Sequence, residues 1–185
     1  MNRKIFLKTA TLSAGAVAIS PLAMAKSNNL NSLDRSDDLN QMEPRIIRTG
    51  EGKDQIVLGD HQIVKLNGKD TNGQFTLIEQ YNDPGIEIPM HVHDDEDEVF
   101  HVLSGELQVK VGEETKLLKA GDVGFCPRGI PHSWKVVGSE KAKVMLSIFP
   151  SGLELMFDEL AALPAGPPDF EKVAKICAKY NIQFV

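Results

Sequence analysis

The chain has 185 residues and a formal net charge of −6, with 42% hydrophobic and 25% charged residues. This length and composition favour one folded globular domain with a core of ordinary size. An acidic chain without a cluster of Lys and Arg is a poor partner for nucleic acid or for an anionic membrane surface, so neither partner is expected.

The first 25 residues have the three parts of a cleavable export signal. Arg3 and Lys4 precede an apolar stretch over residues 10–19, and residues 23–25 form an A-x-A cleavage pattern. The apolar stretch is too short to span a bilayer, so we expect no stable membrane anchor after cleavage. The Arg-Lys pair resembles a twin-arginine signal with one substitution, which leaves that route and general secretion both open. The sequence predicts a periplasmic or secreted protein.

The mature chain divides by composition into a polar segment and a β-rich segment. Residues 26–44 are rich in Asn, Ser and Asp and lack periodicity, which predicts a flexible polar arm. Residues 45–150 alternate short β-like runs with turn pairs such as Asn67-Gly68 and Pro84-Gly85, a pattern typical of an all-β sandwich or closed barrel. The β-like runs are 56–58, 62–66, 75–78, 99–103, 107–111, 123–126, 136–137 and 144–149.

Residues 151–185 differ from the rest and predict two short helices. The first helix is expected over Leu153–Leu163, where Pro164 ends it, and the second over Phe170–Tyr180. The second carries an apolar stripe at helical spacing, which predicts packing against the exterior of the barrel. Neither helix carries an obvious set of reactive side chains.

Three histidines and one glutamate lie in two short segments that can meet. His91 and His93 are two residues apart in a β-like run, so they share one face of the strand. Glu98 lies five positions beyond His93 and rejoins that face only if the acidic run 94–97 turns. A proline-glycine turn before His132 would bring that residue back beside the first segment from a neighbouring strand. We therefore predict a metal site of these four residues.

The predicted donor set favours a transition metal. Three imidazoles and a carboxylate suit iron, manganese, nickel, cobalt or zinc, and contain too much nitrogen for calcium or magnesium. Water or substrate can fill the remaining positions, as a catalytic metal requires. If Glu98 is not a ligand, Asp97 or Glu96 is its substitute. His101 is three residues from Glu98 and should face the opposite side, as a surface or packing residue.

Four other side chains have two open interpretations each. Cys126 and Cys177 match no zinc spacing, so they are interpreted as two buried thiols, with a disulfide as the alternative. Trp134 and Phe100 each share a strand face with one of the four candidate ligands. Each therefore either lines a pocket beside the site or packs in the core.

The two segments resemble the two sequence motifs of the cupin superfamily. Where the second family motif ends in Asn, this chain has Val136, but that Asn is not a metal ligand in the family. The motifs cover about 50 residues, and the strand pattern extends the resemblance over residues 45–150. The matching residues are Gly85, His91, His93, Glu98 and Gly105 in the first motif and Gly121, Pro127, Gly129 and His132 in the second.

The resemblance implies a fold, a metal and an oligomeric state. The expected fold is the cupin double-stranded β-helix, a jelly-roll barrel, with a short C-terminal helical tail. It implies one divalent transition metal, held by the four residues named above. Cupins commonly pair through barrel faces and exchanged N-terminal strands, so a homodimer that uses residues 45–66 is expected.

A looser resemblance concerns the activity. The segment 97–105 and the proline-broken tail look like the quercetinase branch of cupins. This likeness implies a metal-dependent dioxygenase for a small aromatic or enolisable substrate, in which Glu98 both binds the metal and accepts the substrate hydroxyl proton. Two alternatives stay open, because cupins span many functions. One is a non-catalytic module that binds a sugar or small acid, and the other is a metal-dependent isomerase or decarboxylase.

Overall fold

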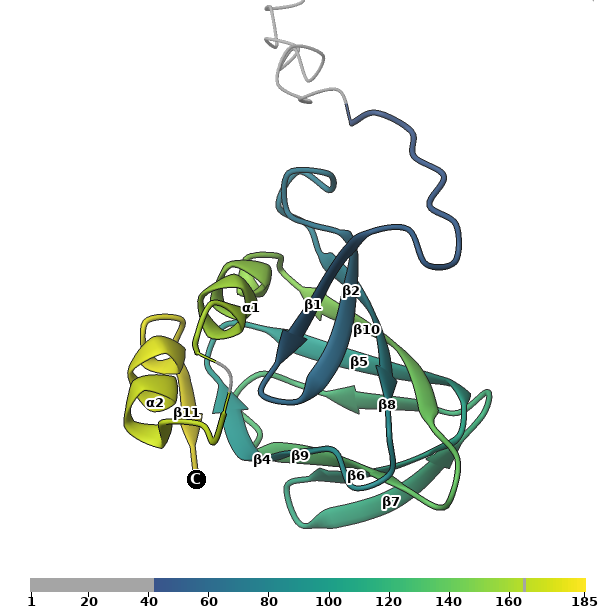
Figure 1. Cartoon of the computed structure of the whole chain (residues 1–185), viewed down its shortest axis with the longest axis vertical. Coiled ribbons are helices and arrows are strands. Elements are labelled where there is room, and N and C mark those ends of the chain that lie inside the picture. The colour runs from purple at the N-terminus through teal and green to yellow at the C-terminus, as the bar shows by residue number, and fades with distance from the viewer. Residues whose placement is uncertain (1–41, 165) are drawn as a thin grey trace, which may run out of the picture. The chain divides into compact units, whose positions relative to one another are not determined.

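The computed structural model describes residues 42–164 and 166–185. The predicted export signal and nearly all of the predicted polar arm lie outside the described residues. The described part consists mainly of antiparallel strands in two sheets, followed by a helical tail, so the predicted all-β class is confirmed (Figure 1). No helix in this part of the chain is long and apolar enough to cross a membrane.

The two sheets are built from strands that are far apart in the sequence. The first sheet has the strand order β1-β2-β3-β10-β5-β8 and the second the order β11-β4-β9-β6-β7. Successive strands often lie in opposite sheets, as β3 and β4 or β4 and β5 do, so their connections cross between the sheets. The strands are β1 Lys53–Val57, β2 Asp60–Leu66, β3 Thr76–Asn82, β4 Glu87–His93, β5 Asp97–Ser104, β6 Glu106–Val111, β7 Glu114–Lys119, β8 Val123–Cys126, β9 His132–Val137, β10 Ala142–Phe149 and β11 Ile182–Phe184.

Alternating side chains form the core between the sheets. In β10 the side chains of Val144, Leu146 and Ile148 are buried, and the residues between them are only partly buried. This period of two follows from the pleat of a strand, which points successive side chains to opposite faces. Phe100 of β5 and Leu107 of β6 are fully buried in the same core.

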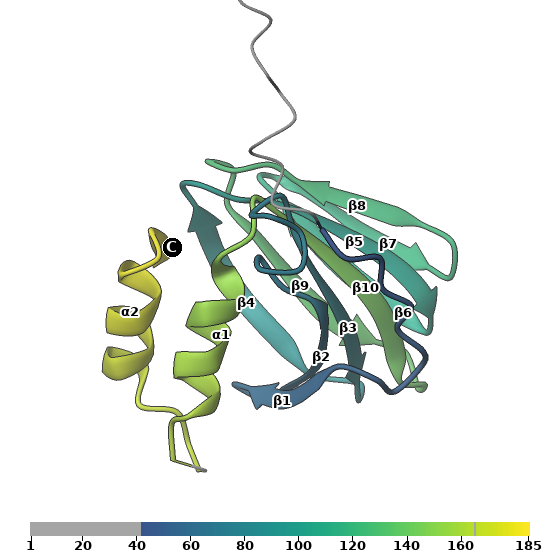
Figure 2. The same ribbon diagram turned by 90° about the horizontal axis from the view of Figure 1, so that it is seen from above.

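The helical tail packs against one end of the sheets (Figure 2). Helix α1 is Leu153–Ala161 and helix α2 is Phe170–Ala178, each two residues shorter than predicted. Both helices contribute buried side chains to the same core as the strands, so the tail is part of the packed interior. The strand β11 was not predicted, because three residues are too few to show a period. It pairs with β4 and extends the second sheet.

Candidate metal centre

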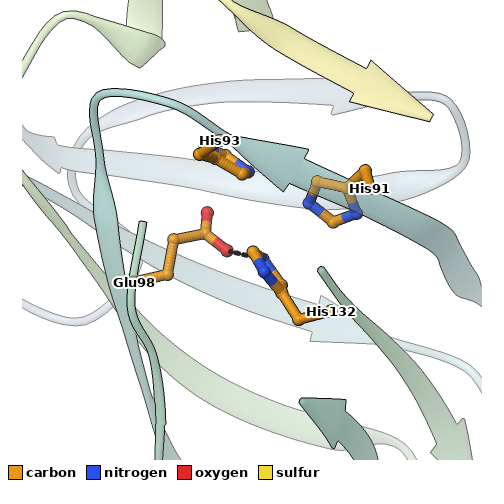
Figure 3. Close-up of side chains that lie close together, drawn as sticks. All are labelled: His91, His93, Glu98 and His132. Atoms are coloured by element: carbon orange, nitrogen blue, oxygen red, sulfur yellow. Dashed lines mark hydrogen bonds and ion pairs between the residues drawn. The ribbon is translucent and has the colours of Figure 1, made fainter. Parts of the chain in front are cut away.

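The four predicted ligands converge between the two sheets. His91 and His93 come from β4 and His132 from β9, all in the second sheet, whereas Glu98 comes from β5 in the first. One candidate ligand atom from each side chain lies within 4.8 Å of those of the other three. All four side chains are buried, and Figure 3 shows them pointing toward a common centre.

The turn between β8 and β9 fixes the position of His132 relative to the other segment. Its Gly129 N–H donates to the carbonyl of His93 over 2.7 Å, at a φ of +75° that favours glycine. Arg128 donates to the carboxylate of Asp97 from its backbone and from its guanidinium, at 2.8–3.1 Å. These hydrogen bonds hold the pKa of Asp97 at about 2. The turn is thereby tied to the end of β4 and the start of β5.

Backbone carbonyls orient two of the three imidazoles. The Nδ1 of His91 donates to the carbonyl of Pro89 over 2.8 Å, and the Nδ1 of His132 to that of Ile130 over 3.1 Å. A proton held at Nδ1 leaves the Nε2 lone pair of a neutral imidazole for a metal. The Nε2 of His132 lies 3.0 Å from Oε2 of Glu98, and a proton or a cation must lie between these two acceptor atoms.

His93 lacks such a partner. Both of its ring nitrogens are buried without a hydrogen bond among the described residues. The Oε2 of Glu96, itself buried and without a hydrogen bond there, lies 3.5 Å from Nδ1 of His93, a charge contact. A buried polar atom without a hydrogen bond costs roughly 1–3 kcal/mol of folding free energy. A partner that binds these atoms of His93 and Glu96 would therefore be stabilised by relieving that cost.

The site is electrostatically set for a cation. Burial, with the neighbouring His132 second, lowers the pKa of His91 to about 4, so its imidazole is neutral at neutral pH. Burial also acts to lower the pKa of His93, but Glu96 and Glu98 outweigh it and raise the pKa. Burial acts to raise the pKa of Glu98, but the hydrogen bond to His132 and the other two imidazoles lower it overall.

The residues fit one divalent transition metal. A single ion with bonds of about 2.1 Å holds its ligand atoms within roughly 4.2 Å of one another, so small side-chain shifts would suffice. The unpartnered Nε2 of His93 and the acceptor pair of His132 and Glu98 both gain a partner when a cation lies between them. The set of three nitrogens and one oxygen matches borderline transition metals.

A cavity of about 60 Å³ adjoins three of the four residues, His91, His93 and Glu98. It lies between the sheets and the helical tail, and most of its wall is apolar. The tail contributes Met156, Phe157, Leu160 and Cys177, so α1 and α2 limit the space beside the site. The remaining lining residues are Val57, Leu58, Asp60, Gln62, Gln80, Ile88, His91, His93, Glu98, Trp134, Leu146, Ile182 and Phe184.

The other candidate residues take different positions. Asp97, the substitute ligand, is engaged with Arg128 on the outside, and His101 is exposed on β5, as predicted. Trp134 lines the cavity, whereas Phe100 is buried in the core and is not part of the cavity wall.

The two cysteines are buried free thiols, so the interpretation as thiols holds. Burial, the largest influence, raises the pKa of Cys126 to about 12 and that of Cys177 to about 11. A thiol with such a pKa is a poor nucleophile at neutral pH.

One group of polar residues escaped the sequence analysis. Asp60 and Gln62 of β2, with Gln80 and Asn82 of β3, are buried side by side, and the first three line the cavity. Polar residues at alternate positions of a strand usually mark its solvent face. Their spacing alone therefore carried no signal that they point inward.

Comparison with known proteins agrees with this geometry. The cupin domain family matches residues 79–149. A quercetin 2,3-dioxygenase of Bacillus subtilis is 33% identical over 93 residues, which cover 50% of this chain and 28% of that enzyme. An uncharacterized protein of Aquifex aeolicus is 32% identical over 88 residues, 48% of this chain and 67% of that protein. The chain belongs to the cupin superfamily.

A solved structure supports the same fold for this cupin. KdgF from Halomonas sp. superposes with a TM-score of 0.54 at 18% identity, over 61% of this chain and 99% of that one. This likeness concerns the fold alone. The match to the Bacillus enzyme spans little more than a quarter of that protein's length, so the activity of the whole enzyme does not carry over directly.

Proposed function

We propose that this cupin is a metal-dependent dioxygenase of quercetinase-like type that acts on a small enolisable substrate. The observation that carries the proposal is the buried set of His91, His93, Glu98 and His132 beside a cavity. The 33% identity to a quercetin 2,3-dioxygenase over 93 residues supports it.

The metal, when bound, would supply Lewis acidity and, if redox-active, a centre for oxygen chemistry. Glu98 acts as the general base and accepts the hydroxyl proton of the substrate on its carboxylate. A general base must lie within hydrogen-bond reach of the proton that it takes. Before a metal binds, the contact with Nε2 of His132 lowers the pKa of this carboxylate, so it is ionised at neutral pH. The apolar cavity wall excludes water and strengthens these charge interactions.

The size of the cavity favours a small substrate. About 60 Å³ accommodates roughly four waters, which is far less than a three-ring flavonol needs. A substrate with a few carbon atoms and an enolisable hydroxyl fits the space between the sheets and α1. A flavonol would require the helical tail to move away.

Oxygen uptake tests the proposal. Protein loaded with iron, manganese, nickel or cobalt is incubated with small hydroxyketones, diketones and flavonols while dissolved oxygen is recorded. We expect uptake with an enolisable compound, and its loss in Glu98→Gln. Retained metal but no oxygen uptake with any compound would contradict the dioxygenase. Product without oxygen consumption would indicate the isomerase or decarboxylase, and binding without product the non-catalytic module.

Export and assembly complete the proposal. The three-part pattern of residues 1–25 supports a mature protein in the periplasm or outside the cell. Its partner is a small molecule, and the family habit of pairing supports a homodimer. The expectation of export rests on the sequence, since residues 1–41 lie outside the described part of the chain.

A further inference from the structure

Asp60 is a buried carboxylate that the proposed chemistry does not use. Its exposed fraction is 2%, and within residues 42–164 and 166–185 no Lys, Arg or His nitrogen lies within 4.0 Å of it. Three amides surround it instead. Gln62 and Gln80 each donate to Oδ2 over 2.7 Å, and Asn82 donates to Oδ1 over 2.5 Å.

Further hydrogen bonds to the amide oxygens fix the orientation of two of these amides. The Oδ1 of Asn82 accepts the backbone N–H of His61 over 2.8 Å, so its Nδ2 must face Asp60. The Oε1 of Gln62 accepts from Gln55 over 3.3 Å, which turns its Nε2 to Asp60 as well. The carboxylate is therefore held in one position by a network that is itself anchored in β1, β2 and β3.

Asp60 shares one cavity with the candidate metal ligands. Asp60, Gln62 and Gln80 line the same space as His91, His93 and Glu98. Asp60 and Glu98 thus lie on the first sheet and the two histidines on the second, and all four line one cavity between the sheets.

A purely structural role explains this arrangement poorly. A buried carboxylate without a cationic partner is costly, and apolar side chains at these positions would pack the barrel at lower cost. Burial raises the pKa of Asp60, the amides oppose this, and the charge of Glu98 raises it further. Such a group gains from a partner that brings a hydrogen-bond donor or positive charge, and groups of this kind cluster at functional sites.

We propose that Asp60 binds a ligand in this cavity. The ligand is a small neutral compound with a hydroxyl group beside a second oxygen, as in a hydroxyketone, an enediol or a vicinal diol. A carboxylate has about four acceptor positions, and three are filled, so Oδ1 keeps one for a ligand hydroxyl. The ligand oxygens then face the metal set across the 60 Å³ cavity. This inference rests on the metal centre of the proposed function.

The charges of the cavity favour a neutral ligand. Glu98 and Asp60 together balance a divalent ion, because the three histidines are neutral when they bind it. A carboxylate anion would add negative charge to a desolvated space that holds two carboxylates already. A neutral hydroxyketone adds none and supplies the donor that Asp60 lacks.

Ligand binding to cobalt(II)-loaded protein tests the inference without turnover. The visible cobalt bands are followed under nitrogen during titration with hydroxyacetone or with pyruvate, an anion of similar size. We expect wild type to bind hydroxyacetone more tightly than pyruvate. In Asp60→Asn the affinity for hydroxyacetone should fall roughly tenfold, because one ligand hydrogen bond and one charge are lost. Cobalt content should stay unchanged.

Two controls separate ligand binding from folding. Asp60→Ser removes the charge without placing an N–H group against the three amide donors. It should weaken the binding of hydroxyacetone as much as Asp60→Asn does. Asp54→Asn changes an exposed carboxylate of β1 and should behave as wild type. The thermal unfolding temperature is recorded for each variant.

The outcomes distinguish the inference from the proposed function. A variant of Asp60 that keeps its cobalt and binds hydroxyacetone like wild type overturns the role of Asp60. A wild-type preference for pyruvate, or no response to hydroxyacetone, overturns the ligand class even if neither variant folds. Failure of wild type to take up cobalt overturns the metal centre, and both proposals with it.

Discussion

Glu96 is the residue whose side chain most directly orients the imidazole of His93. His91 and His132 have their Nδ1 atoms held by backbone carbonyls, which no side-chain substitution removes. Among the described residues, Nδ1 of His93 faces the side chain of Glu96, whose Oε2 lies 3.5 Å away. A cation at Nε2 would draw these two together, since a metal-bound imidazole is a better hydrogen-bond donor at its other nitrogen.

Substitution of Glu96 should therefore weaken metal binding without abolishing it. In Glu96→Gln we expect the affinity for the metal to fall roughly 10–100-fold, the usual effect of removing an outer carboxylate. Competition with a coloured chelator measures the affinity. Asp94→Asn, an exposed acid of the same loop, is the matched control and should leave the affinity unchanged. Equal affinities in Glu96→Gln and wild type would show that Glu96 does not position His93.

The sequence identified the four central residues but not their surroundings. His91 and His93 were found because a spacing of two has a fixed meaning in a strand, and His132 and Glu98 because the motif spacing is specific. The role of Glu96 depends on how the loop after β4 turns, and that of Asp60 on which face of β2 points inward. Neither is encoded in local spacing, so both required the three-dimensional structure.

At the scale of elements, helix α1 is tied to the barrel through Glu154. Its Oε1 accepts the backbone N–H of Gly68, and its Oε2 accepts the Thr76 hydroxyl and the N–H of Gly152. Burial acts to raise the pKa of Glu154, but these hydrogen bonds outweigh it and lower the pKa below 4.5. One side chain thus joins the start of α1 to the loop between β2 and β3.

The loss of this carboxylate should destabilise the protein in a pH-dependent way. Because Glu154 has a lower pKa in the folded state, its contribution is complete above pH 4.5 and is lost as the pH falls below that value. We expect Glu154→Gln to reduce the free energy of unfolding by about 1–2 kcal/mol at neutral pH, allowing for its partial exposure, and by less in acid.

Urea unfolding of the chelator-treated protein at several pH values measures this effect. Treatment with a chelator removes any contribution of metal release. Glu140→Gln, which changes an exposed acid between β9 and β10, is the control and should change stability little. A constant difference between Glu154→Gln and wild type at every pH would contradict the assigned role of the charge.

The elements themselves were predicted to different extents. Helix α2 was found because its apolar positions recur at helical spacing, although both helices end two residues earlier than expected. The strand β11 was missed because it has three residues, and it exists only through its pairing with β4. The sequence also gave no indication that the tail would supply part of the cavity wall, because that requires the position of α1 relative to the sheets.

At the scale of the whole molecule, the fold brings together residues that no single element could hold. The imidazoles come from the second sheet and the two cavity carboxylates from the first, so the site exists only when the sheets face each other. The helical tail then covers one end and limits the space to a small cavity. Metal binding, the size of the ligand and the packing of the tail therefore all depend on the same space between the two sheets.

The most direct test of the account is the metal content of the purified mature protein and of two ligand variants. Wild type should carry about one equivalent of a divalent transition metal, and His91→Ala and His132→Ala should lose most of it while remaining folded. His101→Ala, the exposed histidine of β5, should keep it. Full metal content in both ligand variants, or none in wild type under metal-replete conditions, would contradict the proposed centre.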